Sequence, residues 1–177
     1  GNFKRSEKYP LLLEAYIPGF ETDGIHTMMV DGKMRYVCRS ETWINPSGNY
    51  KAEKSKYTSD GFYLDKKYLG KIDNLSALEL GYCDAWLEST IHVKDITEDP
   101  KNKDRYIVIM ENPTWDTLGS IGNRIYPSYA HSFAARNQMC LLDSPGEFYY
   151  DRNKSTLYYM PADDESTESI FEVPILD

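Results

Sequence analysis

The amino-acid sequence predicts a mainly β protein, either a β-sandwich or a distorted barrel, with one or two short helices. The composition is rich in tyrosine, with 15 Tyr against 6 Phe and 3 Trp, and aromatic side chains favour pleated strands. Two pairs of extended segments are joined by turn-forming residues, which indicates β-hairpins. Helical periodicity is confined to short stretches. Together these patterns are typical of an all-β architecture.

Two hairpins are predicted, one in each half of the chain. In the first, the dipeptide Asp31-Gly32 tolerates positive φ at both turn positions. In the second, the turn is the polar segment 152–155, and aromatic residues would face each other across the two strands. The flanking strands are expected at residues 24–30 and 33–39 for the first hairpin, and 147–151 and 156–160 for the second.

The remaining elements follow from apolar runs bounded by Gly, Pro, Asp or Asn. Asn74 is expected to cap a short helix that begins at Leu75, and residues 129–137 could form a further helical turn or two. No internal repeat or low-complexity linker divides the chain, so residues 1–177 are predicted to form a single β-rich domain. The further strands are expected at residues 11–17, 61–64, 91–93, 105–110 and 169–173.

Charge and composition narrow the classes of partner. The chain has 20 Lys and Arg against 28 Asp and Glu, a net charge of −8, so nucleic acid is a poor partner. The longest apolar run, residues 106–110, is far shorter than the ~20 residues of a membrane-spanning helix. No metal or other cofactor is predicted, because the ligand-type residues lack metal-site spacing. These residues are Cys38, Cys83, Cys140, His26, His92 and His131.

Tryptophans next to carboxylates suggest contact with sugars. A flat indole ring can pack on the CH face of a pyranose while neighbouring carboxylates bind its hydroxyls. The sugar-binding candidates are Trp43, Trp115, Glu111 and Asp116. Glycosidic hydrolysis would need two carboxyl groups about 5 to 10 Å apart. A self-contained hydrolase would draw that pair from Asp84, Glu88, Glu111 and Asp116, and a pure protein-interaction module is the third alternative.

One long segment carries a family resemblance. Residues 141–152, with Asp143, Pro145, Gly146, Glu147 and Asp151, continue into the Leu-Tyr-Tyr-Met-Pro run at 157–161. This segment resembles the "LD-x-PGE-(W/F)-Y-x-D-R … LYY-x-P" pattern of right-handed parallel β-helix glycoside hydrolases and related polysaccharide-active proteins of gut and soil bacteria. The hairpin at Val30–Lys33 and the strand at Phe171–Leu176 are similar to segments of the same family in the same order.

The resemblance implies an accessory, β-sandwich-like domain that packs on the side of a β-helix. In that family the catalytic carboxylates lie on the β-helix coils, so no catalytic residue carries over to this chain. The PGE segment is then a structural motif, in which Pro145-Gly146 sets a turn and Glu147 begins a strand. The resemblance also implies a parent polypeptide as partner, an oligo- or polysaccharide as ligand, and an extracellular, cell-surface or periplasmic location.

Overall fold

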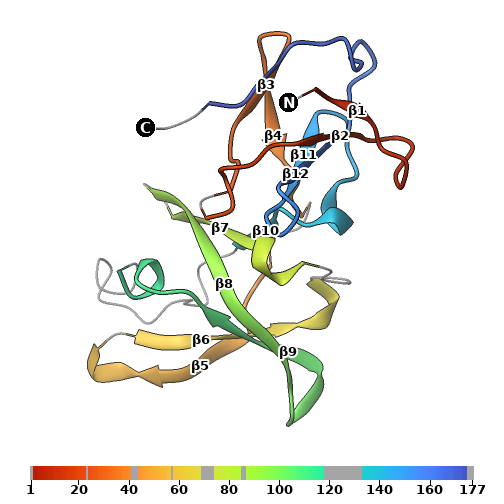
Figure 1. Cartoon of the computed structure of the whole chain (residues 1–177). Helices are drawn as coiled ribbons and strands as arrows, with labels where there is room; N and C mark the ends of the chain where they lie inside the picture. The colour runs from red at the N-terminus through yellow and green to blue at the C-terminus, as the bar shows by residue number, and fades with distance from the viewer. Residues whose placement is uncertain are drawn as a thin grey trace. The chain divides into compact units, whose positions relative to one another are not determined.

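The structure is a computed structural model that describes residues 2–22, 24–40, 44–56, 58–68, 74–84, 87–117 and 133–174. The predicted mainly β class is confirmed. The chain forms two compact units, the terminal unit of residues 1–39 and 137–177 and the inserted unit of residues 40–136 (Figure 1). Each unit contains one sheet. A single domain across residues 1–177 stays a prediction.

The terminal unit is built on a seven-stranded sheet with the order β1-β2-β12-β11-β4-β3-β13. Neighbouring strands are antiparallel except β11 and β4, which run parallel and bring the two halves of this unit together. The strands are β1 (Lys4–Arg5), β2 (Leu13–Tyr16), β3 (Met28–Val30), β4 (Lys33–Val37), β11 (Glu147–Asp151), β12 (Thr156–Tyr159) and β13 (Phe171–Glu172).

Both predicted hairpins are present, although the first strand of the first hairpin begins at Met28 and not at residue 24. Asp31 and Gly32 have φ values of 49° and 73°, the positive values that a tight two-residue turn requires, and they join β3 to β4. In the second hairpin Tyr149 lies opposite Tyr158, and their rings stack 5.9 Å apart. The predicted aromatic pairing across β11 and β12 is therefore present, and it fixes the register of this hairpin.

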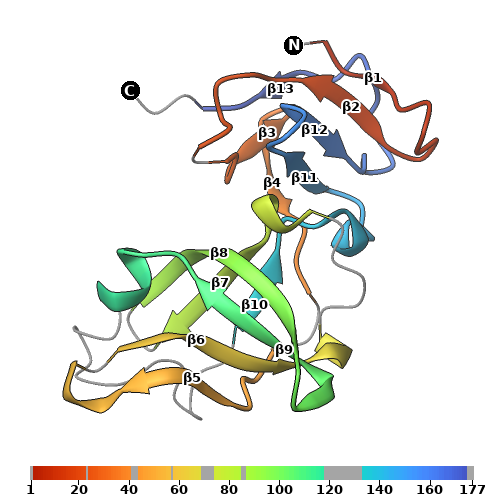
Figure 2. The same cartoon turned by 60° about the horizontal axis from the view of Figure 1, so that its bottom comes forward.

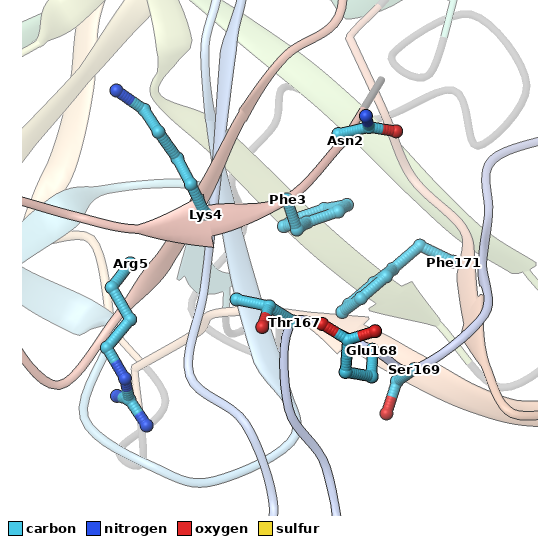
Figure 3. Close-up of a pocket in the computed structure, with 8 residues that line it drawn as sticks. All are labelled: Asn2, Phe3, Lys4, Arg5, Thr167, Glu168, Ser169 and Phe171. Atoms are coloured by element: carbon cyan, nitrogen blue, oxygen red, sulfur yellow. The ribbon is translucent and has the colours of Figure 1, made fainter.

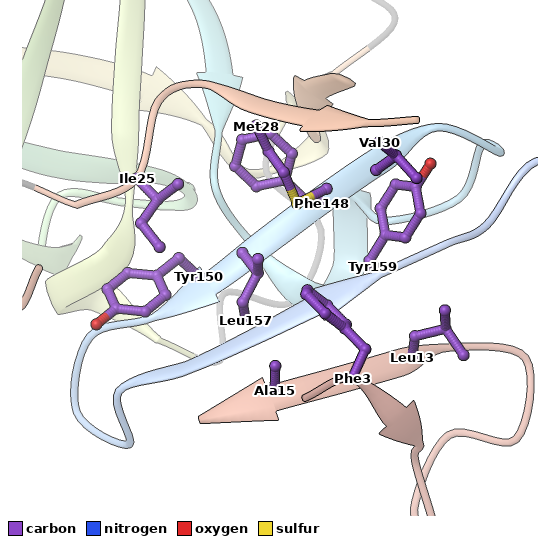
Figure 4. Packing of buried hydrophobic residues seen from close by; sticks show 10 residues of the cluster. All are labelled: Phe3, Leu13, Ala15, Ile25, Met28, Val30, Phe148, Tyr150, Leu157 and Tyr159. Carbon is purple, nitrogen blue, oxygen red and sulfur yellow. The ribbon is translucent and has the colours of Figure 1, made fainter. Parts of the chain in front are cut away.

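The core of the terminal unit lies on one face of its sheet (Figure 4). Successive strand residues point to opposite faces, so every second residue contributes to this core. Phe148 and Tyr150 on β11 meet Leu157 and Tyr159 on β12 in this way. Residues from the other strands and the N-terminal segment complete the cluster, namely Phe3, Leu13, Ala15, Ile25, Met28 and Val30.

The seven-stranded sheet is strongly curved. Strands β1 and β13 are its two opposite edges, yet the ring of Phe3, which precedes β1, stacks on the ring of Phe171 in β13. The ring centroids are 3.8 Å apart, so the two edges approach each other (Figure 2). We call the line along which these edges meet the seam of the sheet. The sheet thus has the form of a barrel left open along one side.

A buried carboxylate attaches the segment between β12 and β13 to the sheet. Glu165 is 9% exposed, and its carboxylate accepts hydrogen bonds from Arg35 Nε at 3.0 Å and the Ala162 N–H at 2.8 Å. Arg35 Nη2 and the Tyr159 hydroxyl donate to it as well. Burial acts to raise the pKa of Glu165, but the hydrogen bonds from Tyr159, Arg35 and the Ala162 N–H, together with the charge of Arg35, outweigh it, and the pKa lies below its ordinary value.

The inserted unit is built on a six-stranded antiparallel sheet with the order β10-β7-β8-β9-β6-β5. Bulges interrupt the long β8–β9 hairpin at residues 93–95 and 98–99, where they increase local twist. The strands are β5 (Gly48–Glu53), β6 (Thr58–Asp65), β7 (Glu79–Asp84), β8 (Leu87–Asp99), β9 (Asn102–Met110) and β10 (Phe133–Arg136).

This second sheet also curves until its ends meet. Ile44, shortly before edge strand β5, exchanges two backbone hydrogen bonds with Phe133 in the opposite edge strand β10. The rings of Phe62 and Phe133 are parallel, with centroids 5.4 Å apart, although β6 and β10 are not neighbours in the sheet. A half-open barrel results, with these two rings in its interior.

The structure differs from both helical predictions. Asn74 precedes a single 3-10 turn, η3 (Leu75–Ala77), and its side chain makes no capping hydrogen bond. Residues 133–136 of the second predicted helix form strand β10, and residues 129–132 lie outside the described residues. Residues 114–117 are α-helical, where no helix was expected. The other 3-10 turns are η1 (Lys54–Lys56), η2 (Lys66–Tyr68) and η4 (Met139–Leu141).

Substitution E165Q tests the buried carboxylate. Because Arg35 would lose its buried counter-charge, we expect the free energy of unfolding to fall by about 3 kcal/mol at neutral pH. The pKa of Glu165 is lowered by folding, so its contribution is present above the ordinary value of 4.5 and is lost as the pH falls below it. Urea denaturation followed by circular dichroism should therefore show a smaller difference between the two proteins in acid than at neutral pH.

The matched control is D163N, which removes an exposed carboxylate two residues away. We expect its stability to lie within about 0.5 kcal/mol of the parent chain. An equal loss in D163N, or a difference for E165Q that does not become smaller in acid, would contradict this account.

Substitution F133A tests the closure of the inserted sheet. Phe133 is fully buried, so its truncation should lower the free energy of unfolding by about 3–5 kcal/mol, measured by urea denaturation. L11A removes a side chain of similar character that is 76% exposed, and it should change stability by less than about 0.5 kcal/mol. Similar losses in both variants would show that ring packing across this sheet is not decisive.

Candidate functional site

A groove of about 650 Å³ opens on the terminal unit, along the seam of its sheet (Figure 3). One wall is the N-terminal segment 2–5, which includes β1, and the other is segment 167–171, which leads into β13. The volume lies within the 300–1,000 Å³ range of small-molecule sites. The groove therefore has the dimensions of a ligand site.

The floor of the groove is aromatic. Phe3 is 7% exposed and Phe171 is half-buried, and their rings stack with an interplanar angle of 23°. Tyr159 contacts Phe171 edge to face, with ring centroids 5.9 Å apart. Because these rings pack on the core of the unit, the floor is held in place and keeps an apolar edge toward the groove.

The rim of the groove is polar. Asn2 supplies an amide, Thr167 and Ser169 supply hydroxyls, and Glu168 supplies a carboxylate. The Glu168 N–H donates to Ser166 Oγ at 3.1 Å, and Ser169 Oγ accepts from the Ser166 N–H at 3.2 Å. These local bonds shape the turn that presents Glu168, so the rim is an ordered segment.

Two cations flank the groove on its β1 side. Lys4 and Arg5 extend in opposite directions from this strand, as neighbouring strand residues do (Figure 3). Lys4 Nζ lies 3.4 Å from a Glu14 carboxylate oxygen, and Arg5 Nη1 donates to the Pro10 carbonyl at 3.4 Å. The Lys4 charge is thus paired with Glu14, and Arg5 and Glu168 place opposite charges on the two walls.

The structure places Trp115 in the interior of the inserted unit. Its side chain is 2% exposed, and its indole N–H donates to the Ser59 carbonyl at 2.7 Å. The ring centroid lies 5.9 Å from that of Phe62 and 6.4 Å from that of Phe133. Trp115 therefore presents no ring face to solvent for a sugar to pack on. Trp43, the other predicted platform, lies outside the described residues.

The predicted carboxylates lie on the inserted unit. Glu111 follows β9 and is exposed, while Asp116 is half-buried in the helical turn 114–117. The Asp116 N–H donates to Asn112 Oδ1 at 3.1 Å, which orders this turn. Asp84 and Glu88 belong to the β7–β8 hairpin, and their side chains are not among those described. The sugar-binding role of Glu111 and Asp116 stays a prediction.

The turn of the PGE segment sets the direction of β11. Gly146 has a φ of 88°, its N–H donates to the Met160 carbonyl at 2.7 Å, and its carbonyl accepts from the Tyr36 N–H at 3.2 Å. A side chain at this φ would be strained, so glycine suits the position. Pro145 and Asp143 are exposed beside this turn, and Asp143 accepts a hydrogen bond from the Ser144 hydroxyl.

The two other motif residues make local contacts at the two ends of β11. Glu147 accepts a hydrogen bond from the Ser144 N–H at 3.3 Å, and burial raises the pKa of its carboxyl. Asp151, 4% exposed, accepts from Lys154 Nζ at 2.6 Å and from the Asn153 N–H at 3.1 Å. These bonds hold the two ends of the strand in the hairpin.

The described residues contain no group of three or more His, Cys, Asp or Glu side chains arranged to hold a metal ion. In the same part of the chain, none of the helices has both the length and the apolar character needed to cross a membrane.

The groove is not predicted by the sequence. Its aromatic floor comes from Phe3 and Phe171, which are 168 positions apart in the chain (171 − 3) and carry no shared motif. The sequence predicts a strand at residues 169–173, but the strand pattern does not indicate that this edge meets the other edge of the sheet. That contact depends on the curvature of the sheet.

Comparison with known proteins gives a likeness of fold. No family model matches the sequence, and no curated protein matches it. A solved structure titled "Glycoside hydrolase" is similar, with a TM-score of 0.65 and 17% sequence identity over 97% of this chain. The chain spans 30% of the length of that structure's chain. The two folds are thus alike, and this chain corresponds to a part of the longer one.

Substitution W115F tests the interior role of Trp115. Loss of the indole N–H would remove the hydrogen bond to the Ser59 carbonyl, so we expect the free energy of unfolding to fall by about 1–3 kcal/mol. Urea denaturation measures this change, and the exposed E111Q, with an expected change below about 0.5 kcal/mol, is the control. Unchanged stability in W115F would show that this hydrogen bond does not stabilise the inserted unit.

Proposed function

We propose that this chain is a non-catalytic accessory domain of a larger, secreted carbohydrate-active β-helix protein, and that it packs on the helix and contacts glycan. The observation that carries the proposal is the likeness to the solved structure titled "Glycoside hydrolase", in which 97% of this chain corresponds to 30% of that one. The PGE hairpin, with its structural turn at Gly146, supports the same reading.

Exposed apolar residues on the terminal unit support the packing role. Met34 is 56% exposed, Tyr36 63% and Ile170 67%. The register places Met34 opposite Met29, and Tyr36 shares its face because it lies two residues along β4. Met29 also lies opposite Glu172, two residues after Ile170, so these apolar side chains share one face of the sheet. Such a surface suits contact with another protein body.

The rim of the groove supports binding without hydrolysis. Cleavage of a glycosidic bond requires two carboxyl groups on either side of it. Of the described residues that line the groove, Glu168 is the single carboxylate, and it is accompanied by hydroxyl, amide and cationic groups. This set can bind sugar hydroxyls. In the proposal, the reactive acids belong to the rest of the parent polypeptide, which is extracellular, on the cell surface or periplasmic.

The packing role is tested in the longer polypeptide that contains this chain. Y36E places a charge on the proposed contact face, so we expect it to lower the melting temperature of the longer polypeptide by about 3 °C or more. The same change should leave the melting temperature of this chain alone within about 1 °C, because Tyr36 is exposed there. L11E, at a residue that is 76% exposed in a loop, is the control.

The non-catalytic role is tested on this chain alone, with a panel of aryl-glycosides and polysaccharides. We expect no turnover above buffer. Turnover that disappears in E111Q or D116N would replace the proposal with a self-contained hydrolase. If the longer polypeptide melts at the same temperature with and without the Y36E substitution, the packing role is contradicted.

A further inference from the structure

We propose that the groove along the seam of the terminal unit is a binding site for a short, neutral oligosaccharide. This inference rests on the proposed glycan contact and gives that contact a location. It concerns residues that the sequence did not indicate as binding residues, chiefly Phe3, Arg5, Glu168 and Phe171.

Backbone groups at the seam are directed away from the sheet. The Ser6 N–H donates to the Leu12 carbonyl at 2.9 Å, so the next pair, Arg5 with Leu13, is of the type that does not exchange hydrogen bonds. The N–H and C=O of Arg5 therefore point away from β2, toward the open edge. Peptide groups at this edge add donors and acceptors to the groove.

The opposite edge has the same arrangement. The Asp31 N–H donates to the Ile170 carbonyl at 2.9 Å, so the adjacent pair, Phe171 with Val30, leaves the N–H and C=O of Phe171 pointing away from β3. Both walls of the groove thus offer backbone hydrogen-bonding groups next to an aromatic floor.

This combination matches the chemistry of a sugar ring. A pyranose presents CH groups, which pack on aromatic surface, and hydroxyls, which both donate and accept hydrogen bonds. The floor supplies Phe3 and Phe171. The walls supply an amide, two hydroxyls, a carboxylate and a guanidinium in addition to the backbone groups. A hydroxyl-rich ligand can pair with each of these.

The charges of the rim favour a neutral saccharide. Lys4 is paired with Glu14, and the remaining charges, Arg5 and Glu168, are opposite in sign. An acidic saccharide would gain from Arg5 but would be repelled by Glu168. The carboxylate and the guanidinium can instead bind hydroxyls of one neutral ligand.

The short edges disfavour a peptide strand. Addition of a strand to a sheet depends on a row of backbone hydrogen bonds along the edge. Strands β1 and β13 contain two residues each, so each edge offers few such bonds. A bound peptide would then depend on side-chain contacts for most of its affinity, as small ligands do.

The test is an NMR titration of the full chain with cellotetraose, xylotetraose and maltotetraose. Tetragalacturonate and a short extended Thr-Val peptide are added as separate arms. We expect at least one neutral tetrasaccharide to shift the amide signals of Arg5, Glu168 and Phe171. E168Q should weaken that binding about fivefold or more, as the loss of one hydrogen bond predicts, and F171A should weaken it further. E7Q, an exposed carboxylate outside the groove, should leave it unchanged.

Because F171A removes part of the core, E168Q is the deciding variant, since its side chain is exposed. Shifts confined to other residues would overturn the groove as the site and leave glycan contact standing. Shifts in the groove with tetragalacturonate or the peptide alone would assign a different ligand class and overturn the inference. No shift in any arm would also overturn it, while the packing role would still be decided by the melting temperature of Y36E.

Discussion

Aromatic packing between distant parts of one curved sheet is the interaction on which each unit depends. A curved sheet whose edges do not join by a full ladder must bury its inner face in another way. In the terminal unit Phe3 stacks on Phe171, and in the inserted unit Phe62 stacks on Phe133. Rings bury a large apolar area from few residues, so strands as short as β1 and β13 can still close a core.

The groove is a consequence of this mode of closure. Because the rings, and not a hydrogen-bonded ladder, bridge the seam, the backbone of both edges stays directed outward above an apolar floor. The Glu165 carboxylate attaches the segment between β12 and β13 to Arg35 and Tyr159. It thereby positions the wall of the groove that carries Glu168. The residues that stabilise the terminal unit thus also form or position the proposed binding site.

The proposed accessory role would use two different surfaces, one for the parent polypeptide and one for the ligand. The terminal unit has both kinds of surface, an exposed apolar face at Met34 and Tyr36 and a polar groove with an aromatic floor. The buried Trp115, in contrast, belongs to the core of the inserted unit.

The sequence by itself determined the mainly β class and both hairpins, because the Asp31-Gly32 turn and the alternation across Tyr149 and Tyr158 are encoded in neighbouring residues. It could not determine that residues 133–136 form an edge strand, or that Trp115 is interior, since both depend on residues far away in the chain. The groove was decided by tertiary structure alone. Sheet curvature brings Phe3 to Phe171, and curvature is a property of the assembled strands.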